Sequence, residues 1–317
     1  MRPARPAGPS GAALGVLCAA AVCAPVAAQQ IPDPDFDATV ASPAFPSGTG
    51  PHVLVDAAHQ NFHTADGRYG AFAAVLRADG YRIGSGTRSL DAEALAGVDV
   101  LVIANPGMEG GASWALPTAP VFTEAEVATV RQWVEQGGAL FLIADHMPAA
   151  GAAASLAAAF GVRFTNGYTF GPRDGSGIPG DRFTRADGTL RPHPITDGRH
   201  ASERVDSIRT FTGQAFQLVA PADTLLRYGA DAVTLLPVDA GAGTLDERTP
   251  RVPSPSWPHA VALEVGQGRA VLFGEAAAFS AQLAGPNRFP MGMNHPDAAR
   301  NKQLLLNVLH WLSGLTG

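Results

Sequence analysis

His52-Val-Leu-Val-Asp-Ala-Ala-His-Gln-Asn-Phe-His63 is the stretch around which the rest of the chain is organised. Val53 to Val55 is a short β-branched and aliphatic run typical of a core strand, and Gly67 to Gly80 is predicted to be a helix. The polar residues of the stretch therefore lie on a strand-to-helix loop. In open α/β sheets, loops at the carboxyl ends of the strands bind ligands. The stretch thus predicts both the fold class and the place of a site.

Further apolar runs repeat this arrangement along the chain. Val98 to Ala104, Ala139 to Ala144 and Arg269 to Phe273 are nearly continuous, as strands buried on both faces are. Thr123 and Glu126 form a capping box, which marks the start of a helix. Helices are expected at 67–80, 90–95, 123–134, 151–160 and 298–312. The alternation predicts an α/β domain with a mostly parallel sheet.

The second half of the chain has a different pattern. Residues 165–199 are rich in Gly, Asp, Arg and Pro and are expected to be a loop-rich insertion. Between Val205 and Glu264, short strand-like pieces alternate with turns, which favours antiparallel pairing. The Pro-rich segment 248–258 is expected to be a surface loop. The predicted organisation is a flexible Pro-rich arm at 29–51 followed by a single domain at 52–317.

The first 28 residues match a cleavable secretory signal. Two arginines precede an apolar stretch from Ala12 to Ala24, and Val26-Ala27-Ala28 stands before Gln29. The alternative is a membrane anchor, but the apolar run is too short to span a bilayer comfortably. We expect export to the periplasm or the extracellular space.

Composition excludes several classes of function. Both cysteines, Cys18 and Cys23, lie in the predicted signal, so the mature chain has no thiolate nucleophile and no cysteine ligand for zinc. Signal removal takes Lys plus Arg from 22 to 20 against 28 acids, a net charge of about −8. With one lysine, Lys302, and no basic cluster, nucleic acid is not expected as a partner. No later apolar run reaches membrane-spanning length. The sequence does not predict an oligomeric state.

Several segments together resemble a known family. The resemblance rests on Trp133-Val-Glu-Gln-Gly-Gly138 leading into a buried strand, on Gly266-Gln-Gly-Arg-Ala-Val-Leu-Phe-Gly-Glu275, and on Asn301 to Leu312. They are similar to class I glutamine amidotransferase-like proteins, and more narrowly to exported bacterial members related to gliding-motility ABC transporter accessory domains. The resemblance implies a three-layer, flavodoxin-like sandwich. The family's glutaminases use a cysteine after a central strand, where this chain has Asp145-His146, so glutamine hydrolysis by that route is not expected.

Polar side chains follow each predicted strand and are expected to meet at one edge of the sheet. Imidazoles and carboxylates bind zinc and other divalent metals, and a metal-bound hydroxide is a nucleophile near neutral pH. One hypothesis is therefore a metal-assisted hydrolase for a small or carbohydrate-like substrate, with Glu275 as general base. Its metal ligands are His59, His63, Asp145 and His146, and its catalytic residues are Glu275, His146 and Asp145. Substrate contacts are expected from Asn61, Asn105, Glu109, Trp114 and Asn294.

Two alternatives stand beside this hypothesis. The histidines and acids at strand ends can serve only to cap helices or to bond backbone. Alternatively, the pocket can bind a ligand or carbohydrate without catalysis, because Trp114, Tyr168 and Phe62 offer stacking surfaces beside polar groups. The hydrolase hypothesis makes one geometric demand. A ring nitrogen of His59 or His63 must lie within hydrogen-bond or ligand reach of Asp145, His146 or Glu275, directly or through one water or ion.

Overall fold

The central element of the computed structural model is a seven-stranded sheet in the order β11-β14-β15-β5-β4-β2-β3. The structure describes residues 30–171, 180–241 and 245–316, and the predicted signal peptide lies outside these ranges. The strands of the sheet are β2 (His52–Asp56), β3 (Arg82–Gly86), β4 (Val100–Ala104), β5 (Ala139–Ile143), β11 (Asp223–Arg227), β14 (Pro258–Val265) and β15 (Gly268–Phe273).

Five of these strands run parallel, and their order explains where a site can form. β3, β2, β4, β5 and β15 pair in parallel, whereas β14 pairs antiparallel with β15 and β11 antiparallel with β14. Numbered along the chain, the parallel strands have the order 2-1-3-4-5, as in doubly wound sheets of the flavodoxin type. The direction of winding reverses between β2 and β4, and ligands bind outside the carboxyl ends of strands at such a point. The predicted α/β class with a mostly parallel central sheet is confirmed.

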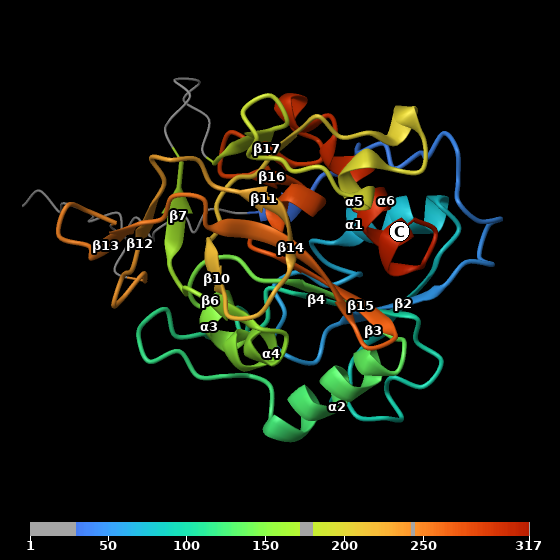
Figure 1. The fold of residues 1–317 in the computed structure, drawn as a ribbon, viewed down its shortest axis with the longest axis horizontal. Coiled ribbons are helices and arrows are strands. Elements are labelled where there is room, and N and C mark those ends of the chain that lie inside the picture. The colour runs from blue at the N-terminus through green and yellow to red at the C-terminus, as the bar shows by residue number, and fades with distance from the viewer. Residues whose placement is uncertain (1–29, 172–179, 242–244, 317) are drawn as a thin grey trace, which may run out of the picture.

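Helices cover both faces of the sheet, which gives three layers (Figure 1). One face carries α1 (Gly70–Ala78) and α6 (Asn301–Leu312), and the other carries α2 (Glu124–Glu135), α3 (Ala149–Ala152) and α4 (Ala154–Ala159). Successive strand residues point to opposite faces. Phe141 therefore packs in the core beneath α1 and α6, while Leu140 and Leu142 pack beneath α2. Two buried faces explain why the strand sequences are continuously apolar.

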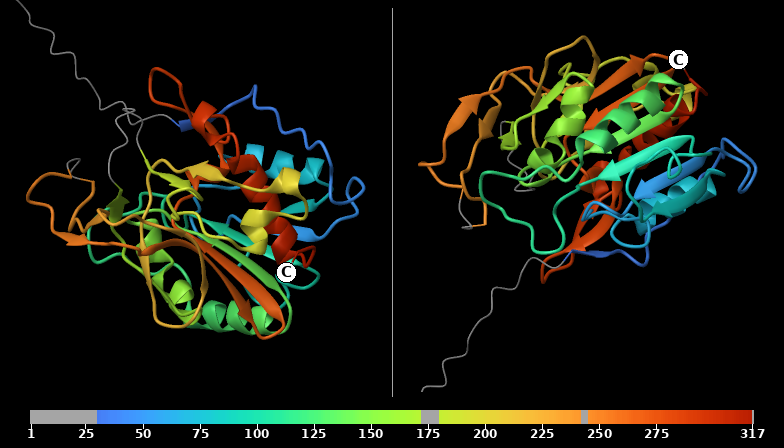
Figure 2. Two further views of the ribbon diagram at one scale, coloured as in Figure 1. Left: turned by 45° about the horizontal axis from the view of Figure 1, so that its top comes forward. Right: turned by 90° about the horizontal axis from the view of Figure 1, so that it is seen from below.

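Smaller antiparallel sheets surround this centre, mostly in the second half of the chain (Figures 1 and 2). The three-stranded sheets are β1 (Gln30–Pro32) with β16 (Ala281–Ala284) and β17 (Phe289–Gly292), and β7 (Tyr168–Phe170) with β12 (Val233–Leu235) and β13 (Arg251–Pro253). The two-stranded sheets are β6 (Val162–Phe164) with β10 (Phe216–Leu218), and β8 (Arg182–Thr184) with β9 (Ser207–Arg209). The remaining elements are α5 (Pro194–Asp197) and the 3-10 helices η1 (Ala201–Glu203), η2 (Ala277–Phe279) and η3 (Pro296–Ala298). Antiparallel pairing in the second half matches the expectation.

Three local expectations differ from the structure. Residues 90–95 form turns instead of a helix, because the amide of Leu90 donates to Glu126 and that of Ala94 to Asp91, which replaces helical bonding. The 248–258 segment contains β13, which pairs with β12 at the outside of a small sheet, where prolines are tolerated. β14 is eight residues long, whereas the sequence predicted only short strands in this region.

The segment expected as a flexible arm lies along the domain. β1 adds a third strand to β16 and β17, and further on the Phe45 ring packs edge-on against Tyr81 at 5.2 Å between centroids. The amide of Ala44 donates to the Asp79 carboxylate at 2.8 Å. The pairing of β1 with β16 fixes the position of Gln30 in the fold. Among the described residues, no helix is both long and apolar enough to cross a bilayer.

Candidate functional site

The loops that follow β2, β4, β5 and β15 meet at a small cavity of about 140 Å³ at the carboxyl edge of the sheet. The three residues predicted to be catalytic, Asp145, His146 and Glu275, all line it. The other lining residues are Gln30, Phe62, His63, Met108, Trp114, Phe211, Thr212, Ala277 and Met291. Segments far apart in the sequence thus converge as the parallel sheet predicts.

Asp145 is a buried carboxylate held from two sides. Its Oδ1 accepts a short hydrogen bond from the backbone amide of Ala276, and its Oδ2 accepts one from Asn105 Nδ2 at 2.7 Å. Burial raises the pKa of Asp145 to about 7, although both hydrogen bonds oppose the shift. Its protonation therefore changes near neutral pH.

Glu275 lies fully buried beside Asp145. Its Oε2 accepts a hydrogen bond from the amide of Ala278 at 2.8 Å, while Oε1 has no partner that meets hydrogen-bond geometry among the described residues. Burial, and then the charge of Asp145, raise the pKa of Glu275 well above its usual range, although the amides of Phe211 and Thr212 counteract this. Two adjacent carboxyls in a dry site cannot both ionise easily, so at least one of the two is protonated at neutral pH.

His146 stands between two aromatic rings at the wall of the cavity. Its ring stacks on Tyr168 at 4.1 Å between centroids and lies 5.9 Å from Trp114. Nδ1 lies 2.7 Å from the carbonyl of Met147 and must donate to it. Burial lowers the pKa of His146 to about 4, so the ring is neutral at pH 7 and Nε2 is left as an acceptor.

Asn105 connects His63 to Asp145 beneath the cavity. Asn105 Oδ1 accepts from the Asp145 amide at 2.8 Å, which fixes the orientation of the carboxamide. Asn105 Nδ2 then faces His63 Nδ1 at 3.4 Å as well as the Asp145 carboxylate. Burial, and then the charge of Arg68, lower the pKa of His63 to about 3. His63 is thus a neutral ring, and Asn105 stands between it and Asp145. Among the described residues, no ring nitrogen of His59 or His63 bonds directly to Asp145, His146 or Glu275.

His59 faces away from this cavity. Its Nδ1 bonds the Asp56 carboxylate at 2.9 Å and its Nε2 bonds Glu126 at 3.0 Å. Burial alone would lower the pKa of His59, but the hydrogen bonds and charges of Asp56 and Glu126 outweigh it and raise that pKa. Burial alone would raise the pKa of Glu126, but hydrogen bonds with Thr123 and His59 outweigh it and lower that pKa to about 2. His59 joins β2 to α2.

The predicted metal ligands therefore do not form one set. His59 is bound to two other carboxylates, and both oxygens of Asp145 already accept hydrogen bonds. Within the described ranges, no three side chains of His, Cys, Asp or Glu are arranged to hold a metal ion. The donor set does not fit zinc as it stands, because a structural or catalytic zinc needs three or four protein ligands around one point.

The predicted substrate-binding residues separate into two groups. Trp114 lines the cavity, and Asn105 lies beneath it. The other three do not line the cavity. Asn61 accepts from the His59 amide at 3.0 Å, Glu109 pairs with Arg68 at 2.8 Å, and Asn294 donates to Asp33 at 2.9 Å. These contacts are structural.

Several residues at the site were not predicted from the sequence, among them Gln214 and Gln30. Gln214 Nε2 donates to the carbonyls of Ala144 and Asp145 and so fixes the end of β5. Gln30 enters the wall from β1, which was expected as part of a flexible arm. Neither residue follows a predicted strand of the central sheet, so no sequence signal pointed to it.

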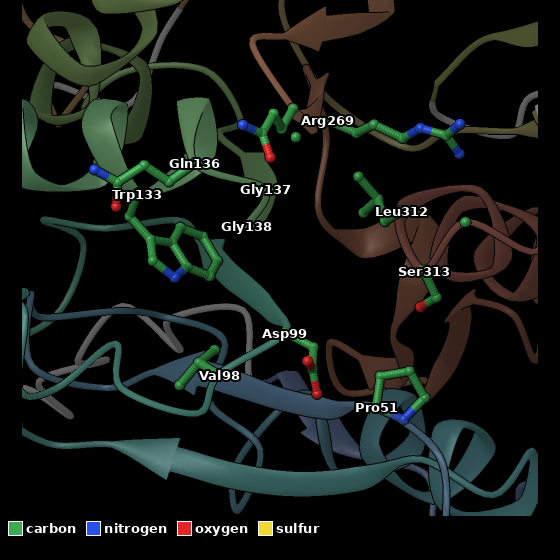
Figure 3. Close-up of a pocket in the computed structure, with 13 residues that line it drawn as sticks. Pro51, Val98, Asp99, Trp133, Gln136, Gly137, Gly138, Arg269, Leu312 and Ser313 are labelled. Atoms are coloured by element: carbon green, nitrogen blue, oxygen red, sulfur yellow. The ribbon is translucent and has the colours of Figure 1, made fainter.

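A larger cavity of about 610 Å³ lies at the opposite, amino edge of the sheet (Figure 3). Its walls include Pro51, Asp99, Trp133, Gly138 and Arg269. Asp99 and Arg269 are its titratable groups, and Asp99 is 55% exposed. This cavity has more room, but it lacks the buried acids and imidazoles of the carboxyl edge.

No protein-family model matches the chain, and no curated protein is similar to it in sequence. Among solved structures, the mmIFT52 N-terminal domain has 16% identity and a TM-score of 0.58, with 82% of this chain and 97% of that domain covered. This likeness shows a shared fold.

Other structural neighbours include a ThuA-like protein from Bacteroides uniformis, at 14% identity and a TM-score of 0.42, covering 88% of this chain and 95% of that one. A cytoplasmic protein from Salmonella typhimurium has 14% identity and a TM-score of 0.43, covering 83% and 98%. Both scores are too low to carry an argument. The predicted link to gliding-motility proteins has no support among these matches.

Proposed function

We propose that the chain is a hydrolase that uses acid–base catalysis at the carboxyl-edge cavity, on a small or carbohydrate-like substrate. The observation that carries this proposal is the pair of Asp145 and Glu275, two buried carboxyls with raised pKa values that face a cavity beside neutral His146. Paired carboxyls with separated protonation states are a recurrent acid–base device. Cysteine-dependent glutaminase chemistry is not part of the proposal.

The roles follow from the protonation states. Ionised Asp145 accepts a proton from water as the water oxygen bonds to the electrophilic carbon of the substrate. Protonated Glu275 donates its proton to the leaving group as that bond breaks. Afterwards, Asp145 is protonated and Glu275 ionised, and transfer of the proton back restores the pair. The sequence hypothesis made Glu275 the base, whereas its strongly raised pKa favours the role of acid.

The size of the cavity limits what enters it. A volume of about 140 Å³ equals roughly five water molecules at the density of the liquid. Only the reacting end of a sugar-sized substrate fits, together with the attacking water. Trp114 and Phe62 also line the cavity and offer apolar surfaces to the remainder of the substrate.

The test is hydrolysis of a fixed panel of nitrophenyl esters and nitrophenyl glycosides. Asp145→Asn and Glu275→Gln should each lower kcat/KM by about 10²- to 10⁴-fold, the usual contribution of a general acid or base. Glu124→Gln, at an exposed position on α2, should leave the rate unchanged. If the panel is hydrolysed and neither cavity variant slows it, the assignment of the pair is wrong.

The pH dependence adds an independent check. Asp145 must be ionised, so the rate should rise as pH increases through about 7, the pKa of Asp145. Glu275 must be protonated, so the rate should fall again only at higher pH, above its raised pKa. EDTA should leave the rate unchanged. A loss of activity that added Zn²⁺ restores would instead support the metal-assisted hypothesis.

A second candidate is ligand binding without catalysis. The adjacent rings of Trp114, His146 and Tyr168 favour it, because aromatic rings can hold a planar or apolar face of a ligand without any reaction. Binding of substrate-like compounds that depends on Trp114, with no turnover across the panel, would establish this candidate and exclude the first.

We also propose export and a class I glutamine amidotransferase-like ancestry. Export rests on the leader-like residues 1–28, and the ancestry on the segments around Gly138 and Glu275. Expression of the full chain in a Gram-negative host tests export. Mass spectrometry of the periplasmic protein should show an N-terminus at Gln29, whereas an intact leader on cytoplasmic protein would contradict it.

A further inference from the structure

The amino-edge cavity has the dimensions of a ligand site. Its volume of about 610 Å³ falls within the roughly 300–1,000 Å³ of small-molecule pockets, whereas the carboxyl-edge cavity is smaller than that range. Its walls come from the start of β2, the turn before β4, the end of α2, the hairpin between β14 and β15, and the end of α6. Segments from five parts of the fold thus enclose it.

The aromatic ring of Trp133 lines this cavity, and the surrounding backbone fixes its position. The Trp133 indole lies against the backbone of Gly138, where an added Cβ would overlap the ring. Trp133 is on the last turn of α2, so its backbone is held by the helix. Across the cavity lie Leu312 and Ser313 (Figure 3). This half-buried indole is held in place by the helix and by contact with Gly138, so a ring can stack on it.

Polar groups surround the indole and keep free hydrogen-bonding capacity. Asp99 Oδ2 accepts from the His52 amide at 2.6 Å, and Oδ1 forms no hydrogen bond with the described residues. The carboxamides of Gln136 and Gln267 likewise have no hydrogen-bond partner in the described part of the chain. Carboxamides both donate and accept, and a carboxylate accepts. Together these groups match ligands that carry several hydroxyls.

The charges of the cavity favour a neutral ligand. The Asp99 carboxylate lies 3.8 Å from the Arg82 guanidinium, and Arg269 donates to the carbonyls of Trp311 and Thr316 at 2.6 and 2.8 Å. A phosphate or nucleotide would meet the carboxylate and find a guanidinium already engaged. A hydroxyl-rich neutral molecule avoids both costs.

We infer that the amino-edge cavity binds a neutral saccharide, with one pyranose ring stacked on Trp133 and its hydroxyls bonded to Asp99 and Gln136. The C–H face of a pyranose is apolar and suits the negative face of an indole, while its edge carries donors and acceptors. This binding site lies at the opposite end of the strands from Asp145 and Glu275. It does not depend on the proposed hydrolase activity.

Saturation-transfer NMR with a fixed set of neutral disaccharides tests the inference. Cellobiose, maltose, chitobiose, gentiobiose and xylobiose are each titrated into the purified mature protein. At least one should bind with a Kd of about 1 mM or tighter, the affinity of a weak specific site. Trp133→Ala should weaken that binding about tenfold, equivalent to about 1.4 kcal/mol. Trp133→Phe should retain part of it, which separates stacking from folding.

Trp257→Ala is the matched control, because it removes a half-buried indole that lines neither cavity. It should leave saccharide binding unchanged. Thermal melting confirms that each variant is folded. The inference is overturned if none of the five disaccharides binds at 10 mM, or if Trp133→Ala leaves binding unchanged.

Discussion

The two edges of the central sheet differ in cavity volume and in the number of buried titratable groups. At the carboxyl edge, two carboxyls and two imidazoles crowd into about 140 Å³, and burial shifts the pKa of each. At the amino edge, about 610 Å³ opens over a floor of glycines. The buried titratable groups, which are common at functional sites, therefore lie at the edge with the smaller cavity.

The connections at each edge explain this difference. The loops at the carboxyl edge are long and supply side chains that hold one another, as Asn105 holds Asp145. The turns at the amino edge are short and contain glycines, such as Gly266, whose φ of 62° suits a residue without Cβ. Gly268 allows the hairpin to approach the backbone at Val134 and Gly138. The carboxyl edge is held by side-chain hydrogen bonds between loops, whereas the hairpin at the amino edge is held by close backbone approach.

The largest expected difference between the edges is in the pH dependence of stability. The pKa of Asp145 is about 7 when folded, above its usual 3.8, so its contribution is complete below about pH 4 and is lost as pH rises through 7. The buried rings of His63 and His146 act in the opposite direction, because their pKa values are lowered to about 3 and about 4. The difference in free energy of unfolding between the wild type and Asp145→Asn isolates the carboxyl, and it should fall between pH 5 and 8 by an amount on the order of a few kcal/mol. Urea titrations of both proteins at both pH values measure it, and an unchanged difference would contradict the burial effect.

Asn105 should be the next most sensitive position. Its φ is 46°, and its side chain bonds both the amide and the carboxylate of Asp145. Asn105→Gly should cost about 2 kcal/mol through a buried unsatisfied amide. Asn105→Ala should cost about 1 kcal/mol more, because alanine is strained in the left-handed region. Chemical denaturation compares the two, and equal stabilities would show that backbone strain plays no part.

Glu126→Ala should destabilise the protein by about 2 kcal/mol, because it removes both the capping interaction at Thr123 and one partner of His59. The matched control is Glu124→Ala, an exposed position in the same helical turn, which should change stability by less than about 0.5 kcal/mol. Thermal melts of both variants measure the difference. A loss of hydrolysis without a loss of stability would place His59 in the catalytic site instead.

The smallest effect is expected at the amino edge. Asp99 is 55% exposed and accepts one backbone hydrogen bond, from His52. Asp99→Asn keeps an acceptor, so the free energy of unfolding should change by less than about 0.5 kcal/mol. Denaturation at pH 7 measures it. A cost comparable to that of Asn105→Gly would mean that the two edges do not differ as described.

The sequence predicted the parts of the fold that apolar periodicity controls. Four buried strands and the capping box at Thr123 lie where the pattern placed them, because local propensity and burial agree there. β14 was not recognised at its full length, although it forms a hairpin with β15 across the turn at Gly266 and Gln267. Its other partner, β11, is distant in the sequence.

The same limit applies to the site. Parallel topology brings Asp145, His146 and Glu275 to one edge, so strand ends alone were sufficient to predict their meeting. They were not sufficient to predict the direction of a side chain within a loop. His59 and His63 are four residues apart, yet one bonds Glu126 and the other faces Asn105. That choice depends on partners from other segments, which periodicity does not show.

The two ends of the described chain lie at opposite edges of the sheet. Gln30 lines the small cavity, whereas Gly314 lines the large one. Because cysteine occurs only at positions 18 and 23, a single cysteine introduced at either place would be the sole thiol of a chain that starts at Gln29. A fluorophore attached there would report occupancy of one cavity at a time. Two such labelled variants would measure ligand binding at the two cavities separately.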